Sequence, residues 1–181
     1  MEKISDKTGD SVSSADRREG KYLTFSLASE DFGMSILKIK EIIGMMAITA
    51  VPQTPPYVRG VINLRGKVIP VADLRLRFGM AAKEYTDRTC IIVVEFEGPS
   101  GQILTGVVVD SVSEVLNIKT EAIENKPDFG ADDGIDYILG MAKVSGGVKI
   151  LLDIDRVLSS NESESACNGP NRHTAQECPA A

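Results

Sequence analysis

The feature that most constrains the fold of this chain is a weak internal repeat. Aligned with itself at an offset of 80 residues, the sequence shows four identities in the nineteen positions from 58 to 76: Gly60/Gly140, Gly66/Gly146, Val68/Val148 and Asp73/Asp153. At an offset of 73, a second pattern recurs, which pairs Gly33, Ile36, Ile39, Glu41 and Ile42 with Gly106, Val109, Val112, Glu114 and Val115. The pattern indicates two copies of one structural unit. A chance likeness between glycine-turn hairpins is the alternative.

The repeated unit is rich in residues that favour strands. The chain contains 17 Ile and 16 Val against 12 Leu, and β-branched side chains favour sheets over helices. Residues 22–27 alternate large apolar and small polar side chains, as a half-buried strand does. Residues 91–96 and 103–109 are more continuously apolar, and the turn at 98–101 separates them. An all-β fold is therefore expected.

Residues 58–71 predict a hairpin with its turn at Arg65 and Gly66, because glycine adopts the positive φ that tight turns require. Pro70 lacks an N–H group, so the second strand lies at an edge or its ladder ends there. Short helices are predicted over residues 37–43 and after the capping residues Asp73 and Asp153.

These elements predict two small β-barrels of about five strands each, since closing a sheet removes exposed edges. Each barrel would be marginally stable alone, so the two are expected to pack as one domain. Whether each barrel is contiguous or exchanges strands with the other stays open. Residues 1–20 are expected to form a disordered leader and residues 159–181 a disordered tail, because the first contains very few large aliphatic residues to bury and the second contains none. The folded core between them is expected to span residues 21–158.

Composition and motifs exclude most chemistry. The excess of 26 acidic over 20 basic residues disfavours nucleic-acid binding, and no apolar run reaches the length needed to span a bilayer. With His173 as the one histidine, a Ser-His-Asp or Cys-His site is excluded, and no phosphate-binding glycine loop is present. We expect no catalytic site, metal or cofactor. Function then rests on protein-binding surfaces; an OB-type nucleic-acid-binding barrel and a carboxylate enzyme are the more distant alternatives.

Three segments resemble a known family. Residues 60–75, with Gly-Val-Ile-Asn-Leu-Arg-Gly at their start, are similar to the signature hairpin of the CheW family of chemotaxis coupling proteins. Residues 32–42 and 106–115 extend the resemblance, which covers about residues 20–160. It implies an all-β fold of two SH3-like five-stranded barrels around a third hydrophobic zone. It also implies a non-enzymatic, cytoplasmic adaptor that joins the tips of methyl-accepting chemoreceptors to the regulatory domain of the histidine kinase CheA. Such an adaptor associates with receptor clusters through protein contacts, without inserting into the membrane.

The resemblance also implies roles for particular residues. Ile36, Glu41, Ile42 and Arg65 match family positions linked to receptor binding, and Phe129 matches an aromatic that contacts the kinase in receptor arrays. Structural roles are the alternatives: core packing for Ile36 and Ile42, a local cap for Glu41, a solvated turn charge for Arg65 and loop packing for Phe129. Ser145 stands at the equivalent of Arg65 in the second copy, so the turn itself does not need arginine. An adaptor in a twitching or other receptor-kinase pathway is a second possibility.

Overall fold

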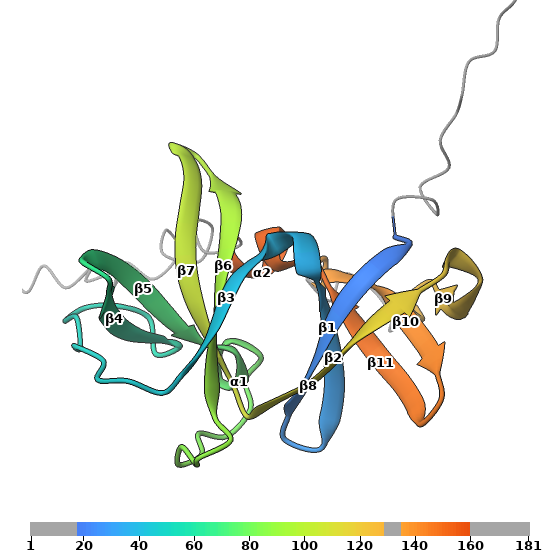
Figure 1. Ribbon diagram of the computed structural model, residues 1–181, viewed down its shortest axis with the longest axis horizontal. Helices are drawn as coiled ribbons and strands as arrows, with labels where there is room; N and C mark the ends of the chain where they lie inside the picture. The colour runs from blue at the N-terminus through green and yellow to red at the C-terminus, as the bar shows by residue number, and fades with distance from the viewer. Residues whose placement is uncertain (1–17, 129–134, 160–181) are drawn as a thin grey trace, which may run out of the picture.

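The computed structural model describes residues 18–128 and 135–159, and strands dominate that part of the chain (Figure 1). In chain order the elements are β1 (Gly20–Leu27), β2 (Glu30–Ser35), the 3-10 turn η1 (Ile36–Lys38), β3 (Ile39–Gly44), β4 (Val58–Leu64), β5 (Lys67–Asp73), α1 (Leu74–Arg77), β6 (Cys90–Gly98), β7 (Gly101–Val109), β8 (Ser111–Ile118), η2 (Thr120–Ala122), β9 (Ile123–Glu124), β10 (Ile138–Val144), β11 (Gly147–Leu152) and α2 (Ile154–Ser159). The mainly β class predicted from the sequence is confirmed.

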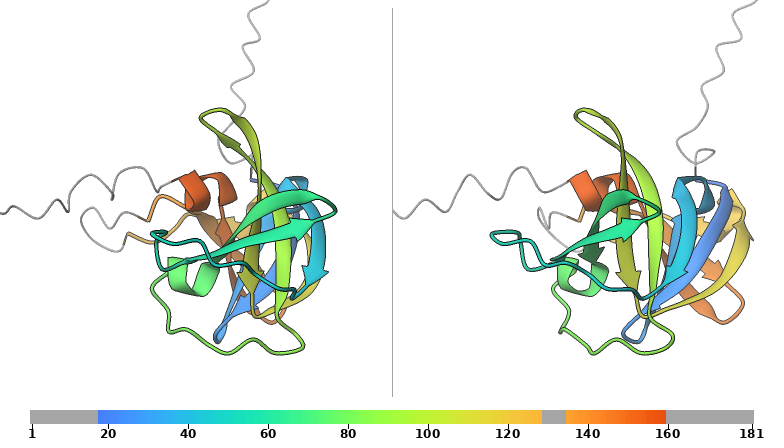
Figure 2. Two further views of the ribbon diagram at one scale, coloured as in Figure 1. Left: turned by 90° about the vertical axis from the view of Figure 1, so that its left-hand side faces the viewer. Right: turned by 60° about the vertical axis from the view of Figure 1, so that its left-hand side comes forward.

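The strands form two sheets, each in its own lobe (Figure 1). Lobe A contains the six-stranded sheet in the order β8-β1-β2-β11-β10-β9, and lobe B the five-stranded sheet in the order β3-β6-β7-β5-β4. Seen from the side, α1 and α2 lie on one side of the molecule and the β6–β7 hairpin projects beyond both lobes (Figure 2).

The two sequence repeats exchange strands between the lobes, which answers the question that the sequence left open. The first copy provides β1–β5 and the second provides β6–β11, yet the β1–β2 hairpin pairs with β8 and β11 in lobe A. Reciprocally, the β6–β7 hairpin pairs with β3 and β5 in lobe B. The registers are equivalent: Val71 opposes Gly106 in lobe B, and Leu151 opposes Gly33 in lobe A. Each lobe therefore needs both copies of the unit.

Three hydrophobic clusters hold this arrangement together. Lobe B encloses one cluster, formed by Ile62, Ile69, Val71, Ile91, Val93 and Val108. Lobe A encloses a smaller one, formed by Tyr22, Ile118, Ala142 and Leu151. The largest, which we call the central cluster, takes side chains from both sheets and both helices, including Phe25, Met34, Ile92, Val107, Leu74 and Val157. Two lobes around a third hydrophobic zone is the arrangement that the family resemblance implied.

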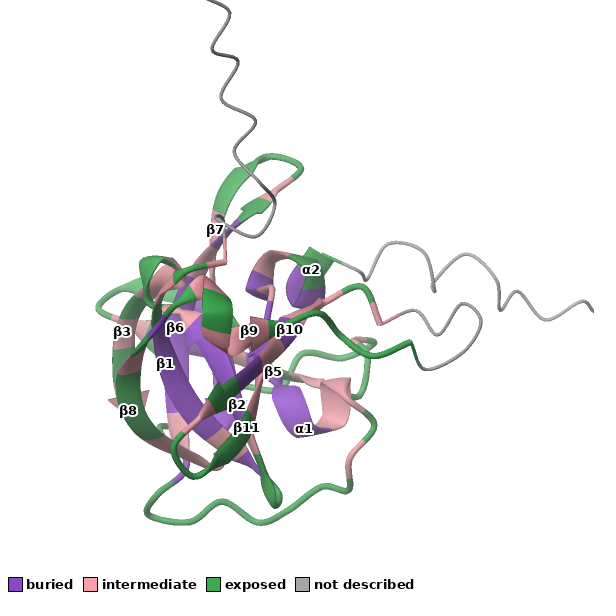
Figure 3. Ribbon diagram, turned by 90° about the vertical axis from the view of Figure 1, so that its right-hand side faces the viewer, coloured by how far each residue is buried: buried purple, intermediate pink, exposed green. Residues whose placement is uncertain are grey.

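Burial follows the position of each strand in its sheet. Strand β1 lies between two neighbours and is mostly buried, whereas the edge strands β3 and β8 expose many of their side chains (Figure 3). The exposed faces of these edge strands are where a binding surface is available without unfolding the core.

The β4–β5 hairpin forms as the sequence predicts. Arg65 and Gly66 both have positive φ, +52° and +83°, which defines a tight turn of the mirror-image type. Pro70 is not on an edge strand, because β5 lies between β7 and β4. Instead the ladder between β5 and β7 begins at Val71, directly after the proline. Of the two alternatives for Pro70, the second is correct.

The capped helices are also present. The Asp73 carboxylate accepts a hydrogen bond from the Arg75 N–H at 2.9 Å and starts α1. The Asp153 carboxylate accepts from the N–H groups of Asp155 and Arg156 at 3.1 and 3.3 Å and starts α2. Each sequence copy therefore ends in the same way, with a β-strand that runs into a short capped helix.

The helix predicted for residues 37–43 is wrong. The chain makes a single 3-10 turn at Ile36–Lys38 and then enters strand β3, where Ile39, Glu41 and Ile43 are half-buried and the residues between them are exposed. Isoleucines at 36, 39 and 43 fit one helical face, but the same segment also alternates with period two. Antiparallel pairing with β6 supplies its backbone hydrogen bonds, and this long-range contact decides for the strand.

Most of the predicted leader and tail, together with Phe129, lies outside the described residues. At the N-terminal boundary, Arg18 and Glu19 already contact lobe A. Arg18 Nη1 donates to Asn125 Oδ1 at 2.7 Å, and Glu19 Oε2 accepts from the Thr120 hydroxyl at 3.2 Å. These contacts anchor the chain where it enters β1.

Candidate functional site

Two of the predicted site residues form a bidentate ion pair. Arg65 Nη1 donates to Glu41 Oε1 at 3.0 Å, and Nη2 donates to Oε2 at 2.9 Å. Glu41 lies on β3 and Arg65 in the β4–β5 turn, so the pair links the two edges of the five-stranded sheet. The Arg65 side chain is 78% exposed and that of Glu41 26%. The guanidinium is therefore held in one orientation while most of it faces solvent.

The backbone of the β4–β5 turn places Arg65 in this exposed position. Arginine at φ +52° occupies a left-handed conformation that costs an L-residue roughly 1–2 kcal/mol. The Asn63 side chain supports the turn, because its Oδ1 accepts a hydrogen bond from the Gly66 N–H at 3.0 Å. The Asn63 side chain thus has a structural role in the turn. The turn thus presents the Arg65 side chain from a left-handed backbone position that Asn63 and Gly66 support.

A β-bulge sets the direction of Glu41. Between Ile39, which opposes Val94, and Glu41, which opposes Val93, strand β3 contains the extra residue Lys40. Such a bulge changes the direction of the residues beside it. The pairing of β8 with β1 shows an equivalent irregularity, close to Glu114. Both copies of the unit therefore contain the bulge.

Glu114 shows that the fold does not require a glutamate side chain at this position. In lobe A the Thr24 hydroxyl bonds the backbone of Glu114, donating to its carbonyl at 2.8 Å and accepting from its N–H at 3.2 Å. The Glu114 carboxylate is exposed and has no ion pair among the described residues. Since Ser145 replaces arginine in the β10–β11 turn, the charged pair belongs to lobe B alone.

Ile36 and Ile42 are exposed rather than buried in the core. Ile36 opens η1 with 36% of its surface exposed, and Ile42 lies on the outward side of β3 with 44% exposed. Leu37, between them in the chain, is 87% exposed. Successive strand residues alternate in direction, so Ile42 and the inward-leaning Glu41 lie on opposite sides of β3. The structure thus joins Glu41 with Arg65 and places Ile36 and Ile42 on the same η1–β3 segment, without bringing all four into contact.

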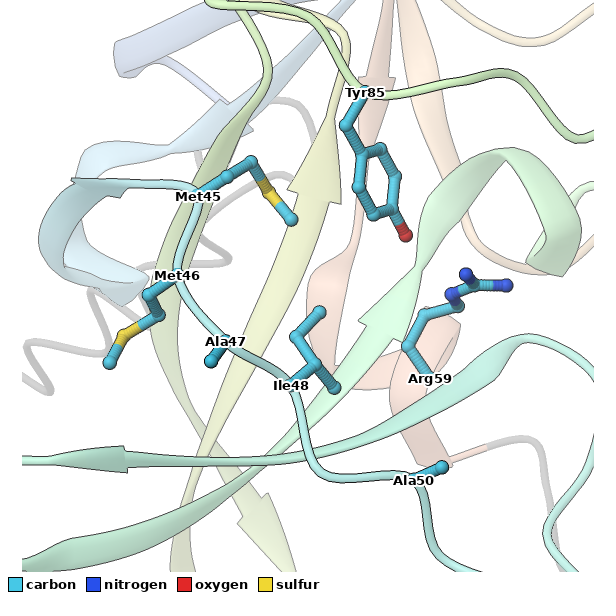
Figure 4. A pocket seen from close by; sticks show the side chains of 7 residues that line it. All are labelled: Met45, Met46, Ala47, Ile48, Ala50, Arg59 and Tyr85. Carbon is cyan, nitrogen blue, oxygen red and sulfur yellow. The ribbon is translucent and has the colours of Figure 1, made fainter.

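Lobe B also carries a groove that the sequence did not reveal (Figure 4). This open hollow of about 510 Å³ is lined by Met45, Met46, Ala47, Ile48, Ala50, Arg59 and Tyr85. The Arg59 guanidinium lies 5.7 Å from the centre of the Tyr85 ring, in the range of a cation–π contact. Burial and, secondarily, the charge of Asp73 raise the pKa of Tyr85, so its phenol stays neutral. The adjacent methionines were the only sequence signal for this groove.

The wall of this groove is fixed by a close backbone approach. Thr49 and Val61 exchange two backbone hydrogen bonds of 2.8 and 2.9 Å. They approach closely because residue 60 is glycine: a Cβ there would lie 2.0 Å from the Thr49 carbonyl oxygen, and its φ is +137°. Gly60, one of the repeated glycines, thus holds the segment after β3 against β4.

Within residues 18–128 and 135–159, no group of three or more His, Cys, Asp or Glu side chains is arranged to hold a metal ion. No helix in that part of the chain is long and apolar enough to cross a membrane. What the described surface offers is a fixed ion pair, exposed aliphatic side chains and an apolar groove, and these features are typical of protein-binding domains.

Comparisons with known proteins agree with this class. The family model described as CheW-like domain matches residues 21–162. The chemotaxis protein CheW of Klebsiella aerogenes is 37% identical over 153 residues, which cover 84% of this chain and 90% of the relative. That of Rhizobium meliloti is 35% identical over 146 residues, with 81% and 92% covered. The crystal structure of the scaffolding protein TtCheW from Thermoanaerobacter tengcongensis aligns with a TM-score of 0.69 at 35% identity, covering 79% of this chain and 94% of that one.

Two exchanged β-lobes with a solvent-facing ion pair and exposed aliphatic side chains are typical of a domain that acts by binding. This chain belongs to the CheW-like domain family. It is accordingly a chemotaxis-type adaptor and not an enzyme.

Proposed function

We propose that this chain couples methyl-accepting chemoreceptors to the histidine kinase CheA in the cytoplasm, so that receptor state controls kinase autophosphorylation. Family membership supports the adaptor role, and the relatives of highest identity reported above are named chemotaxis proteins. The observation that carries the proposal to particular residues is the Glu41–Arg65 pair, which is fixed in geometry, faces solvent and is absent from the equivalent place in lobe A.

The receptor surface lies along η1, β3 and the β4–β5 turn. Ile36 and Ile42 supply exposed apolar area for a receptor helix hairpin, and Arg65 supplies a charged group whose direction Glu41 fixes. Holding an arginine in place before binding reduces the conformational entropy lost in the complex. An interface with a few such anchors is modest in affinity, and clustering of receptors raises the effective affinity through avidity.

The kinase is contacted from a different part of the adaptor. Phe129, which precedes β10 in the sequence, is the residue proposed for a contact with the kinase in receptor arrays. Separate contacts for the receptor and the kinase would allow one molecule to hold the two proteins together. The adaptor would associate with the membrane through its receptors alone.

A second candidate is the same coupling role in a twitching or other non-flagellar pathway. The relative named protein FrzA from Myxococcus xanthus, 27% identical over 146 residues, carries a different name from the others. Deleting the gene in its host and scoring swimming and surface motility separately would distinguish the two pathways.

Simultaneous binding tests the proposal. Immobilised CheA regulatory domain should retain this chain, and the loaded surface should then retain a purified receptor signalling-tip fragment that does not bind the regulatory domain alone. Arg65→Glu should abolish the second step and leave the first unchanged. Failure of the wild-type chain to bridge the two proteins would refute the proposed function.

A further inference from the structure

Two ion pairs at equivalent places in the fold each join a crossover between lobes to a helix. Arg75 on α1 binds Asp110, which connects β7 to β8. Asp155 on α2 binds Lys38 in η1, which connects β2 to β3. The offset of 80 relates Arg75 to Asp155, and the offset of 73 relates Asp110 to Leu37, the neighbour of Lys38. The same contact thus occurs twice, with the charges of helix and crossover exchanged.

The Arg75–Asp110 ion pair is largely buried and is supported by further hydrogen bonds. The Arg75 side chain is only 10% exposed, and its Nε lies 3.0 and 3.1 Å from the two Asp110 oxygens. Asp110 also accepts from the Ala28 N–H at 2.9 Å, and Arg75 Nη1 donates to the Ala81 carbonyl at 3.4 Å. Removing one partner of such a buried network leaves the other charge unpaired, which is strongly destabilising.

The Lys38–Asp155 pair is more exposed than the Arg75–Asp110 pair, and only one of its two carboxylate oxygens has a partner. Lys38 Nζ lies 2.6 Å from Asp155 Oδ2, and the two side chains are 36% and 33% exposed. Asp155 Oδ1 is buried and accepts no hydrogen bond from a protein group; it is the one such side-chain atom among the described residues. A buried acceptor without a partner costs free energy. Opening the pair would let this oxygen reach water, and this gain opposes the loss of attraction between the two charges.

The position of this pair links the proposed receptor surface to the core. Lys38 follows Ile36 and Leu37, whose side chains face solvent. At the other end, Val157 of α2 is buried in the central cluster, and its carbonyl accepts a hydrogen bond from Arg77 Nε at 3.1 Å. The Lys38–Asp155 ion pair therefore connects η1 to α2, which contributes to the central cluster.

We propose that Lys38 and Asp155 are positioning residues for the coupling itself: their ion pair is closed in the free adaptor and opens when a receptor hairpin covers η1. Opening frees α2 to shift within the central cluster, which is the change the kinase side senses. This inference rests on the proposed function. It requires only that the receptor bind the open form more tightly than the closed one, since a ligand shifts an equilibrium by its differential affinity.

Hydrogen exchange of the full chain tests the inference. Adding a receptor signalling-tip fragment to the wild-type protein should accelerate exchange at the α2 amides of Val157 and Leu158, and Lys38→Met should show the faster exchange without the fragment. Lys143→Met is the matched control, because it removes another lysine from a 2.6 Å ion pair, with Glu124, that lies within lobe A. That variant should behave as wild type. The charge exchange Lys38→Asp with Asp155→Lys should restore slow exchange.

A functional readout separates coupling from binding. In receptor-containing vesicles with CheA, Lys38→Met and Asp155→Asn should weaken receptor control of the kinase by roughly tenfold, within the range typical of coupling between sites. The affinities of Asp155→Asn for the receptor fragment and for the kinase should stay within about threefold of wild type, because Asp155 lies on α2, outside the proposed receptor surface. Wild-type α2 exchange unchanged by bound fragment would overturn the inference alone. Absence of fragment binding by the wild-type chain would overturn the proposed function as well.

Discussion

Replacing Arg65 by asparagine should separate the stability of the β4–β5 turn from its binding role. Asparagine tolerates the left-handed conformation that Arg65 adopts at φ +52°, so it keeps the turn. It is too short to reproduce the two hydrogen bonds to Glu41. Gly66 and the Asn63 side chain that supports it remain unchanged. The substitution thus removes the guanidinium and leaves the backbone as it is.

Two opposing terms set the expected change in the free energy of unfolding. Relief of left-handed strain contributes up to about 1 kcal/mol in favour of the variant. Loss of an ion pair whose arginine is 78% exposed costs between roughly 0.2 and 1 kcal/mol. The terms nearly cancel, so the variant should unfold within about 1 kcal/mol of wild type, a change of a few degrees in Tm for a domain of this size.

Urea denaturation and the receptor-binding step of the bridging assay measure the two quantities separately. The variant should unfold near the wild-type midpoint with an unchanged m-value, and it should fail to bind the receptor fragment while still binding the kinase domain. Arg65→Lys is the matched control, because it keeps one positive charge and loses the bidentate geometry; it should bind with intermediate affinity. A loss of stability above about 2 kcal/mol would show that arginine serves the turn. Undiminished receptor binding would remove Arg65 from the site.

Three further outcomes follow from named contacts. Gly60→Ala should destabilise the protein by more than about 2 kcal/mol, because its Cβ would meet the Thr49 carbonyl. Gly66→Ala has open space around its Cβ and should cost only about 1 kcal/mol, for the left-handed backbone alone. Urea denaturation of both variants measures the two losses, and equal losses would contradict the close approach of Gly60 to Thr49. The hydrogen bond from Lys149 and, next, that from Ser26 lower the pKa of Asp31. The folded pKa then lies below the unfolded one, so this contribution is present above about pH 4 and is lost as pH falls through the folded pKa. Asp31→Asn should therefore be less stable than wild type at pH 7 by under about 1 kcal/mol, because the carboxylate is 43% exposed, and the gap should narrow as pH falls through the folded pKa. A gap independent of pH in urea titrations would refute this. Phe129→Ala should weaken kinase–adaptor arrays by roughly 2 kcal/mol or more at the loop contact, measured by sedimentation of reconstituted arrays; unaltered sedimentation would assign Phe129 to loop packing.

Local signals in the sequence predicted local structure well. The β4–β5 hairpin was predicted because Gly66 sits between two apolar runs, and α1 was predicted because Asp73 is a good cap; both depend on neighbours within a few residues. The repeat predicted two equivalent units because each must bury the same pattern of apolar residues. These features are decided by short-range backbone preferences and by burial.

Features decided by distant contacts were not predictable. The segment 37–43 fits both a helical and a strand pattern, and only its pairing with β6 favours the strand. The exchange of hairpins between lobes involves strands from opposite ends of the chain, such as β2 and β11. The Glu41–Arg65 pair joins residues 24 positions apart, and resemblance to a family pointed to both residues without indicating that they touch.

Receptor-dependent autophosphorylation is the most direct test of the central claim that this chain couples receptor to kinase. Vesicles containing a methyl-accepting chemoreceptor, purified CheA and labelled ATP should show kinase activity that rises on addition of the wild-type chain and falls when the receptor is given attractant. Arg65→Glu, added at the same concentration, should leave the kinase at its receptor-independent level. Kinase activity that is the same with the wild-type chain, with the variant and with neither would contradict the account.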